Sequence, residues 1–372
     1  MEDRIYDYWA ATLQDGYIGN LIGMVSSVGG AKALYEMTKK QMTDALHITD
    51  KLAEYIMDRK VDPGSVEEEY YRMQESGISY VNHTDDDFPP KLAAIPSPPY
   101  GLFVKGALPD RLTASVAIVG ARECSEYGRL MAEFFGDRLA REGVQIISGM
   151  AWGIDGIAQE AALNAGGRSY AVLGCGVDIT YPTKNRRLYQ RLCENGNGLI
   201  SEYAPQTAAE ARRFPPRNRI ISGLCDVLIV VEARAKSGTL ITADMAIDQG
   251  RTVMVVPGRL TDNLSAGCIN LLYHGALPAT GLGAVLDQLG TGRQMKLSDL
   301  KCPAPVKDDT GIPEEMKHVL DVMKIEPQSI GRIARCAKMT PETTMMILTR
   351  LEIEGLVREI SPGYYIRQLE LA

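Results

Sequence analysis

Six short apolar segments with helical stretches between them constrain the fold of this 372-residue chain more than any other feature. Each segment is rich in Val and Ile and is apolar along its whole length, as strands buried on both faces are. They lie at residues 115–119, 144–148, 169–173, 198–202, 226–231 and 252–256. This alternation predicts an α/β fold built on a doubly wound parallel sheet.

The segments between these strands have the start and stop residues of helices. A helix is expected at 125–141 with Ser125 as its N-cap, and others at 154–165 and 240–249, each ending before a glycine. Ligands of doubly wound sheets bind outside the carboxyl ends of the strands. Functional residues are therefore expected in the turns that follow the strands.

The turn from Gly120 to Ser125 has the features of an anion site. A helix N-terminus offers unpaired N–H groups and a partial positive charge, and Arg122 adds a planar guanidinium that matches phosphate oxygens. The dinucleotide fingerprint G-x-G-x-x-G does not occur at this turn. The sequence therefore predicts a phosphate-binding domain whose ligand is not NAD, and no cofactor is expected.

Three further turns carry glycine, serine or threonine after a predicted strand. They begin at Ser148, at Gly174 and at Glu232, and the last contains Ser237-Gly238-Thr239. Glycine permits close approach of the backbone to a ligand, and hydroxyl groups add hydrogen-bond donors. One such turn alone is an ordinary connection, but several at one edge of a sheet predict a groove for a polyanion.

The distribution of charge agrees with a groove of this kind. The net charge is −7, but residues 1–99 carry 9 Lys or Arg against 17 Asp or Glu, whereas residues 184–219 carry 8 against 3. Neutralisation of phosphates is local, so the distribution matters more than the sum. The positive charge is concentrated inside the predicted α/β domain.

Composition predicts a soluble, unexported protein that resides in the cytoplasm and does not bind a membrane. The chain is 45% hydrophobic and 23% charged, without an 18-residue apolar run or a basic-then-apolar leader. Seven cysteines form no C-x-x-C pair, which favours a reducing compartment, and four histidines lack ligand spacing, so no metal site is expected.

Compositional breaks divide the chain into five parts. They are an N-terminal helical domain at 1–80, a proline-rich lead-in at 81–101, the α/β domain at 102–292, a linker at 293–312 and a C-terminal domain at 313–372. The acidity of the first part favours packing or partner binding over contact with DNA backbone.

The C-terminal domain has the pattern of a winged helix. Helical stretches at 313–323, 328–336 and 341–354 precede two short strands around Pro362-Gly363. The third helix carries only Arg350 among basic residues, against three glutamates. Sequence-specific reading of duplex DNA is therefore not expected, and a role in protein binding or dimer contact is.

The predicted α/β domain contains six motifs, which occur in this order along the chain: G-A-R-x-x-S-x-Y-G, S-G-x-A-x-G-I-D-x-x-A, G-x-D-x-x-Y-P-x-x-N-R-x-L, F-P-x-R-N-R-I-I-S-G-L, E-A-x-x-x-S-G-T-L-I-T-A and V-P-G. Their combination closely resembles the DNA-processing protein A family, also called Smf, over residues 85–290. The resemblance implies a Rossmann-like domain that binds single-stranded DNA, flanked by a small helical domain of the SAM or helix-hairpin-helix type and a winged helix. It also implies a homodimer without catalytic turnover, which protects incoming strands and loads the RecA recombinase during natural transformation.

The resemblance carries DNA-binding roles to individual residues of the turns. Arg122 and Ser125 would contact phosphates, and Arg217 and Arg219 would reach the groove. The full expected set is Gly120, Arg122, Ser125, Ser148, Gly149, Gly153, Lys184, Asn185, Arg186, Arg187, Phe214, Arg217, Asn218, Arg219, Ser237, Gly238 and Thr239.

Single-strand binding also needs stacking surfaces, for which Tyr181, Phe214 and Trp152 are the candidates. Trp152 departs from the smaller, more polar turn common in the family, so it narrows the groove or adds a stacking face. Ala121 stands where the family often has Ser. Asp155 is expected to cap a helix, because a carboxylate beside DNA phosphates would repel them.

Two other functions remain open on the sequence. The Gly-rich turns also resemble nucleotide-5′-monophosphate phosphoribohydrolases, but Thr242 stands where that family's P-G-G-x-G-T-x-x-E run has its catalytic Glu. A regulator that senses a nucleotide and reads operators through the winged helix is the second alternative, and the acidic third helix argues against it. A dimer would form through apolar surface late in the α/β domain.

Overall fold

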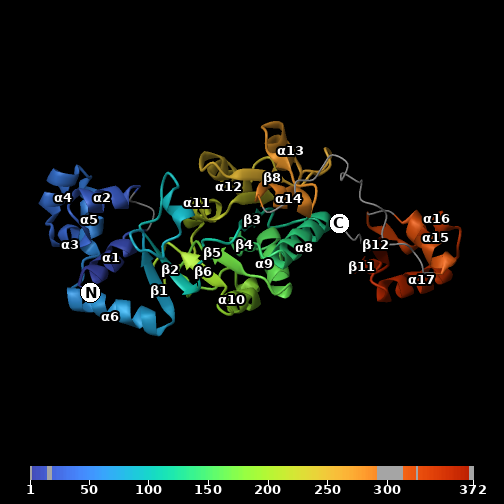
Figure 1. Cartoon of the computed structure of the whole chain (residues 1–372), viewed down its shortest axis with the longest axis horizontal. Coiled ribbons are helices and arrows are strands. Elements are labelled where there is room, and N and C mark those ends of the chain that lie inside the picture. Colours follow the sequence, from blue (N-terminus) through green and yellow to red (C-terminus); the bar gives the residue numbers. More distant parts are fainter. Residues whose placement is uncertain (1, 15–18, 291–312, 324–325, 368–372) are drawn as a thin grey trace. The chain divides into compact units, whose positions relative to one another are not determined.

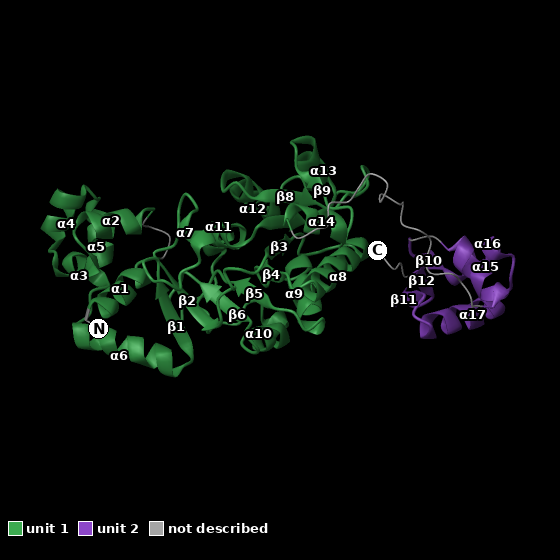
Figure 2. Ribbon diagram, viewed as in Figure 1, with its two compact units in different colours: residues 1–293 green, residues 294–372 purple. Residues whose placement is uncertain are grey.

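The computed structural model describes residues 2–14, 19–290, 313–323 and 326–367. The chain divides into two compact units, residues 1–293 and residues 294–372, which are coloured separately in Figure 2. The linker expected at 293–312 lies outside the described residues.

A nine-stranded sheet of order β1-β2-β6-β5-β4-β3-β7-β8-β9 organises the first unit (Figure 1). Its strands are β1 Ile78–Asn82, β2 Gly101–Gly106, β3 Ser115–Val119, β4 Gln145–Ser148, β5 Ser169–Val172, β6 Gly198–Ser201, β7 Val227–Val230, β8 Thr252–Val255 and β9 Leu277–Pro278. The six strands predicted from the sequence are confirmed, each within one residue at either end. Those six pair in parallel, and all but one of their 25 residues are buried.

The sheet is mixed, which corrects the expectation of a parallel one. β1 pairs with β2 and β2 pairs with β6, both antiparallel, with Ile78 opposite Lys105 and Phe103 opposite Ser201. The expected proline-rich lead-in at 81–101 therefore contains the end of β1 and the start of β2, joined through the short helix α7, Pro90–Ala93. β1 alternates buried with less buried residues, as an antiparallel edge strand does.

Helices cover both faces of the sheet. In Figure 1, α11 and α12 lie on one side of it, and α8, α9 and α10 lie on the other. The helices that follow β3 are α8 Glu126–Arg141, α9 Ile154–Asn164, α10 Arg186–Leu192, α11 Phe214–Leu224, α12 Gly238–Asp248, α13 Ala266–Tyr273 and α14 Leu282–Gln288, with short 3-10 turns at Thr183–Asn185 and Ala211–Arg213. Ser125 caps α8 as predicted, since its side chain accepts a hydrogen bond from the backbone N–H of Gly128.

The N-terminal helices share a core with the sheet. They are α1 Glu2–Thr12, α2 Leu21–Ser27, α3 Ala31–Glu36, α4 Lys39–Leu46, α5 Asp50–Asp58 and α6 Pro63–Glu75. Trp9 and Leu13 are buried in the same cluster as Phe103 and Leu199 of the sheet. Helical structure in this part of the chain is as predicted, and its apolar side chains complete the core of the first unit.

The described residues of the second unit form three helices and a small sheet. The helices are α15 Glu314–Val322, α16 Ile330–Ala337 and α17 Pro341–Ile353, and the strands β10 Gln328–Ser329, β11 Val357–Ser361 and β12 Tyr364–Arg367 have the order β10-β12-β11. All three helices contribute to one core through Val319, Ile333 and Leu348. The helix expected at 328–336 begins only at Ile330, because the two preceding residues pair with β12.

Within the described parts of the chain, no helix is both long enough and apolar enough to cross a membrane.

Candidate functional site

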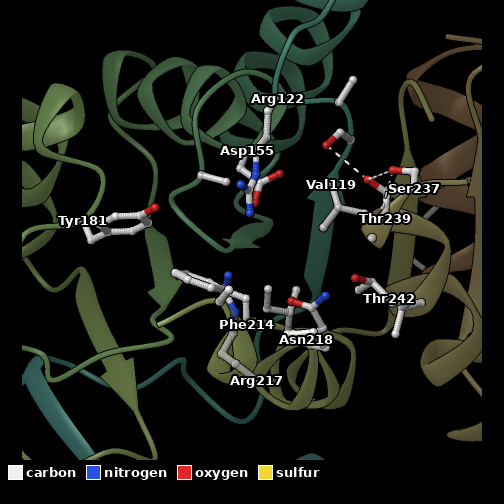
Figure 3. A pocket seen from close by; sticks show the side chains of 18 of the residues that line it. Val119, Arg122, Asp155, Tyr181, Phe214, Arg217, Asn218, Ser237, Thr239 and Thr242 are labelled. Atoms are coloured by element: carbon white, nitrogen blue, oxygen red, sulfur yellow. Dashed lines mark hydrogen bonds between the residues drawn. The ribbon is translucent and has the colours of Figure 1, made fainter. Parts of the chain in front are cut away.

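A cavity of about 500 Å³ lies at the carboxyl end of β3 (Figure 3). At this strand the order of the sheet reverses, since the chain continues to β4 on one side and later returns to β7 on the other. Ligands of doubly wound sheets bind at such a point. The lining residues are Val119, Gly120, Ala121, Arg122, Ala151, Asp155, Tyr181, Ala209, Ala211, Phe214, Pro215, Arg217, Asn218, Ile221, Lys236, Ser237, Gly238, Thr239, Ile241 and Thr242.

Aromatic and cationic side chains from three segments meet in this cavity. The ring centroids of Tyr181 and Phe214 are 5.4 Å apart, with an angle of 37° between the rings. The guanidinium carbon of the exposed Arg122 lies 5.9 Å from the centroid of Phe214. Figure 3 shows Arg122, Tyr181 and Phe214 around the same space. This arrangement offers a flat apolar surface beside a solvated positive charge.

The N-terminus of α12 opens into the cavity. Ser237 caps the helix by accepting a hydrogen bond from the N–H of Thr239 at 3.2 Å, and the Thr239 hydroxyl donates to the carbonyl of Gly120 at 3.2 Å. A Cβ added at Gly238 would meet no atom within 4 Å, so the backbone there is open to a ligand. The positive end of the helix dipole and the exposed Lys236 make this the anion-attracting wall of the cavity.

The N-terminus of α8 already holds an anion from the protein itself. The backbone N–H of Ser125 donates to Glu232 Oε2 at 2.9 Å, and the Ser125 hydroxyl donates to Glu232 Oε1 at 2.5 Å. Glu232 is buried, and a Cβ at Gly128 would lie 2.3 Å from its carboxylate. Ser125, which we expected on a phosphate, therefore binds an internal carboxylate, and Arg122 is the basic residue of this turn that lines the cavity.

Asp155 and Arg217 are buried together at the base of the cavity. Both contact Gly149: its N–H donates to Asp155 Oδ2 at 3.1 Å, and its carbonyl accepts from Arg217 Nη1 at 3.1 Å, while the same guanidinium nitrogen donates to the carbonyl of Val172. Burial raises the pKa of Asp155, and the positive charge of Arg217 offsets only part of this rise. Burial lowers the pKa of Arg217 to about 10, which leaves it protonated at neutral pH.

The position of Asp155 corrects the expectation that it caps a helix. Gly153 is the N-cap residue of α9, and no side chain caps that helix. The Asp155 carboxylate instead holds the turn after β4, through the N–H of Gly149. Its contribution to the site is to fix the backbone on which the cavity is built.

Arg219 points away from the cavity. Its guanidinium makes two hydrogen bonds to the Glu202 carboxylate, at 2.7 and 2.6 Å, and its Nε donates to the carbonyl of Ser97 at 2.8 Å. The side chains of Arg219 and Glu202 are 14% and 3% exposed. Residues two apart on a helix point in nearly opposite directions, so Arg217 and Arg219 of α11 do not share a face. The expectation that both reach the groove therefore does not fit the geometry.

The basic segment before and within α10 lies outside the lining of the cavity. Lys184, Arg186 and Arg187 are exposed. Asn185 is the anchor of this segment, because its Nδ2 donates to the carbonyls of Met150 and Ala151 at 3.0 and 3.2 Å. Since Ala151 and Tyr181 both line the cavity, the basic segment is attached to its edge.

The cavity brings together eight of the seventeen expected residues: Gly120, Arg122, Phe214, Arg217, Asn218, Ser237, Gly238 and Thr239. Ser148 is buried and donates to the carbonyl of Ile118 at 2.6 Å, so it supports the sheet. Gly149 packs closely against Arg217 and Asp155, and Gly153 packs closely against the backbone of Ala121 and Arg122, so both glycines lie next to residues that line the cavity. Ser125 and Arg219 bind internal carboxylates, as described above. The last four expected residues, Lys184, Asn185, Arg186 and Arg187, form the basic segment at the edge of the cavity.

Sequence reasoning missed some of the lining. Lys236 is basic and directly precedes Ser237, a signal that could have assigned it to the site. Ala209 and Ala211 carry no comparable signal. Among the described residues, no group of three or more His, Cys, Asp or Glu side chains could hold a metal ion.

Comparisons with known proteins cover most of the first unit. A family model described as DNA recombination-mediator protein A matches residues 79–290. Protein Smf of Escherichia coli (strain K12) is 34% identical over 307 residues, which are 82% of this chain and 81% of that protein. DNA processing protein DprA of Streptococcus pneumoniae is 41% identical over 222 residues, which are 58% of this chain and 78% of that protein.

The solved structures that are similar to the chain include two of DNA processing protein A. The X-ray structure of DNA processing protein A from Streptococcus pneumoniae gives a TM-score of 0.62 at 33% identity and covers 75% of this chain and 94% of that one. The structure of DNA processing protein A from Helicobacter pylori gives a TM-score of 0.51 at 30% identity, with 57% of this chain and 95% of that one covered. The latter structure is described as revealing a unique single-stranded DNA binding mode.

Proposed function

Because this chain belongs to the DNA recombination-mediator protein A family, we propose that it binds single-stranded DNA in the cavity of Figure 3 and loads the strand onto the RecA recombinase during DNA uptake and transformation. The description of the family names a mediator of recombination and not an enzyme. The Streptococcus pneumoniae relative is named a DNA processing protein, and the structure of the Helicobacter pylori relative is described as giving a single-stranded DNA binding mode. DNA processing is the general role that this chain shares with them.

The observation that carries this proposal is the combination of stacking and charge in one cavity. A strand bound without sequence preference needs aromatic faces for its bases and positive groups for its phosphates. Tyr181 and Phe214 supply the faces, while Arg122, Lys236 and the α12 N-terminus supply the charge. A duplex keeps its bases stacked on one another, so it cannot use the aromatic pair. A preference for single strands follows.

Five exposed cations lie in or beside the cavity and define the electrostatic part of binding. They are Arg122, Lys184, Arg186, Arg187 and Lys236. Each phosphate neutralised on a single strand adds about −0.7 to the slope of log affinity against log salt. If all five contact the backbone, the slope is about −3.5. A slope near zero would contradict the proposed groove.

We further propose that the protein is a homodimer in the cytoplasm. Leu260 and Tyr273 are 87% and 85% exposed in the region after β8, which supports an apolar contact late in the α/β part of the chain. Sedimentation of the wild type beside a Tyr273→Asp variant tests the dimer. Recovery of monomer in the variant supports the assignment, and an unchanged dimer places the contact elsewhere.

The second unit is proposed to be a winged helix that contacts protein. Its third helix, α17, exposes Met345, Met346 and Ile353, and Arg350 is its basic residue. A winged helix that reads DNA inserts its third helix into the major groove. The exposed apolar side chains on α17 therefore favour a protein partner over duplex DNA. Binding of RecA by the full chain and by a Met345→Glu, Met346→Glu variant tests this surface.

The cavity gives no support to a phosphoribohydrolase. Thr242 lines it where that family has a catalytic Glu, and Asp155, the one carboxylate among the described lining residues, is buried against Gly149. Release of free base from nucleoside monophosphates would revive this alternative. A footprint on one defined duplex would revive the alternative of a nucleotide-sensing regulator.

Fluorescence anisotropy of a labelled oligonucleotide tests the proposed function directly. Wild type, Arg122→Ala and Phe214→Ala are titrated with a single strand and with its duplex over a salt series. Tight, salt-sensitive binding of the single strand that weakens in both variants supports the proposal. Equal affinity for strand and duplex, or variants that bind as the wild type does, would refute it.

A further inference from the structure

Trp152 carries an exposed indole at the edge of the cavity and is not one of the residues that line it. It is 48% exposed, whereas Trp9, the other tryptophan of the chain, is 2% exposed. Its neighbour Ala151 lines the cavity. An exposed aromatic ring directly beside a cavity with two further aromatic rings extends the apolar surface available to a strand.

The backbone of Trp152 is fixed on both sides. Before it, the carbonyls of Met150 and Ala151 accept hydrogen bonds from Asn185. After it, Gly153 has a φ of 86°, and a Cβ there would lie 2.3 Å from the carbonyl oxygen of Arg122. The indole is therefore carried by a turn that is tied to the basic segment on one side and packed against the Arg122 turn on the other.

A cation lies over the indole. The Lys184 Nζ is 5.1 Å from the centroid of the Trp152 ring. A Lys ammonium at this distance is attracted by the ring quadrupole. The contact keeps an exposed positive charge next to the ring, and Arg186 and Arg187 add two more exposed charges within three residues of Lys184. A base stacked on the ring would have its phosphate within reach of these groups.

These observations define a path along the molecular surface. It runs from the cavity, with Arg122 and Phe214, over Trp152 to the basic segment that begins at Lys184. Alternating positive and aromatic groups are what a single strand requires, and base–aromatic stacking tolerates any sequence because every base has a π-face. Trp152 is the aromatic group of the outer part of this path.

We propose that Trp152 and Lys184 form a second nucleotide subsite, in which the indole stacks on a base of a nucleotide outside the cavity and the ammonium neutralises its phosphate. This inference rests on the proposed binding of single-stranded DNA. It adds a nucleotide to the footprint and assigns the outer base to a residue that departs from the smaller turn expected for the family.

Quenching of tryptophan fluorescence reports on this subsite separately from the rest of the cavity. Trp9 is buried, and its Nε1 donates to the carbonyl of Arg59 at 2.9 Å, so its emission is insensitive to ligand. Stacking of a base on Trp152 quenches the emission of the wild type. In the Trp152→Phe variant only Trp9 emits, and the quench disappears while binding, followed by anisotropy, persists.

The affinities of Trp152 variants for normal and abasic strands distinguish the contribution of base stacking from that of phosphate neutralisation. Trp152→Leu keeps an apolar side chain without a π-face and is expected to bind an oligodeoxythymidylate about tenfold more weakly than wild type, with a smaller loss in Trp152→Phe. On a strand of abasic residues, which keeps the phosphates, both variants should bind as the wild type does. Tyr71→Ala, which removes a 42%-exposed aromatic ring on α6, is the matched control and should change neither signal.

The outcomes distinguish this subsite from the cavity. Binding that depends on Arg122 and Phe214 but neither quenches Trp152 nor weakens in Trp152→Leu overturns the second subsite and leaves the proposed function intact. An equal loss on abasic and normal strands also overturns it, because the effect would then not come from a base. Absence of any single-strand binding overturns both proposals together.

Discussion

The two arginines Arg122 and Arg219 should respond to truncation in opposite ways. Removal of Arg219 leaves the Glu202 carboxylate, which is 3% exposed, with the Nε2 of Gln14 at 2.9 Å as its remaining side-chain partner among the described residues. Loss of one member of a buried ion pair costs about 3–5 kcal/mol, because the other charge stays buried without compensation. We therefore expect Arg219→Ala to lower the free energy of unfolding by about that amount.

Arg122→Ala should leave stability nearly unchanged and act on binding. Arg122 is exposed in the cavity, so its loss removes about one phosphate contact and makes the salt slope less steep by about 0.7. Arg219→Ala should leave that slope at the wild-type value under conditions in which the variant is folded. Urea unfolding followed by circular dichroism measures the first quantity, and anisotropy over a salt series measures the second.

A double variant completes the test. Replacing both partners with apolar residues of similar size, as in Arg219→Met with Glu202→Leu, should recover most of the stability lost in Arg219→Ala. Part of the loss should remain, because the Nε2 of Gln14 and the carbonyl of Ser97 would still lack their partners. The reasoning is refuted if Arg219→Ala unfolds within about 1 kcal/mol of wild type and reduces the salt slope as Arg122→Ala does.

Three further outcomes follow from the internal contacts. Ser125→Ala removes the cap of α8 and a donor to Glu232, and should cost about 1–2 kcal/mol in unfolding free energy while the salt slope stays constant. Gly153→Ala forces a side chain into a φ of 86° and should cost about 1–3 kcal/mol and weaken strand binding, because the Arg122 turn must move. Burial raises the pKa of Cys225 and of Cys268 to about 12, so both thiols should resist iodoacetamide at pH 8 until the protein unfolds. Because each folded pKa lies above the unfolded value near 9, their contribution to stability is complete below pH 9 and is lost as the pH rises from 9 to 12, which urea unfolding at several pH values measures.

The strands of the central sheet were predictable because they are buried on both faces. Val116 to Val119 and Val227 to Val230 are apolar at every position. Such strands can be recognised without knowing which side chains point to which face of the sheet. β1 and β2 escaped detection because β1 alternates in burial and the segment between them contains five prolines in eleven residues. The proline-rich connection resembled a linker, and nothing local indicated an antiparallel edge.

The site was predictable where its chemistry is carried by one turn. Arg122 and the Ser237-Gly238-Thr239 turn were both identified, and both line the cavity. Contacts between distant segments were not predictable in this way. Glu232 lies 107 residues from Ser125, and Glu202 lies 17 residues from Arg219, so no local pattern shows which serine or arginine is already bound to a carboxylate.

The shared core of the first unit bears on how the protein can be divided. Trp9, Leu13 and Leu34 are buried with Phe103, Leu173 and Leu199, so the helices before residue 77 cover part of the sheet near β1 and β2. A shortened chain that starts at β1 would expose these sheet residues to water, and contiguous apolar surface of that kind promotes association. We therefore expect that a fragment starting at β1 needs a substitute for the missing helices before its behaviour can be compared with that of the whole chain.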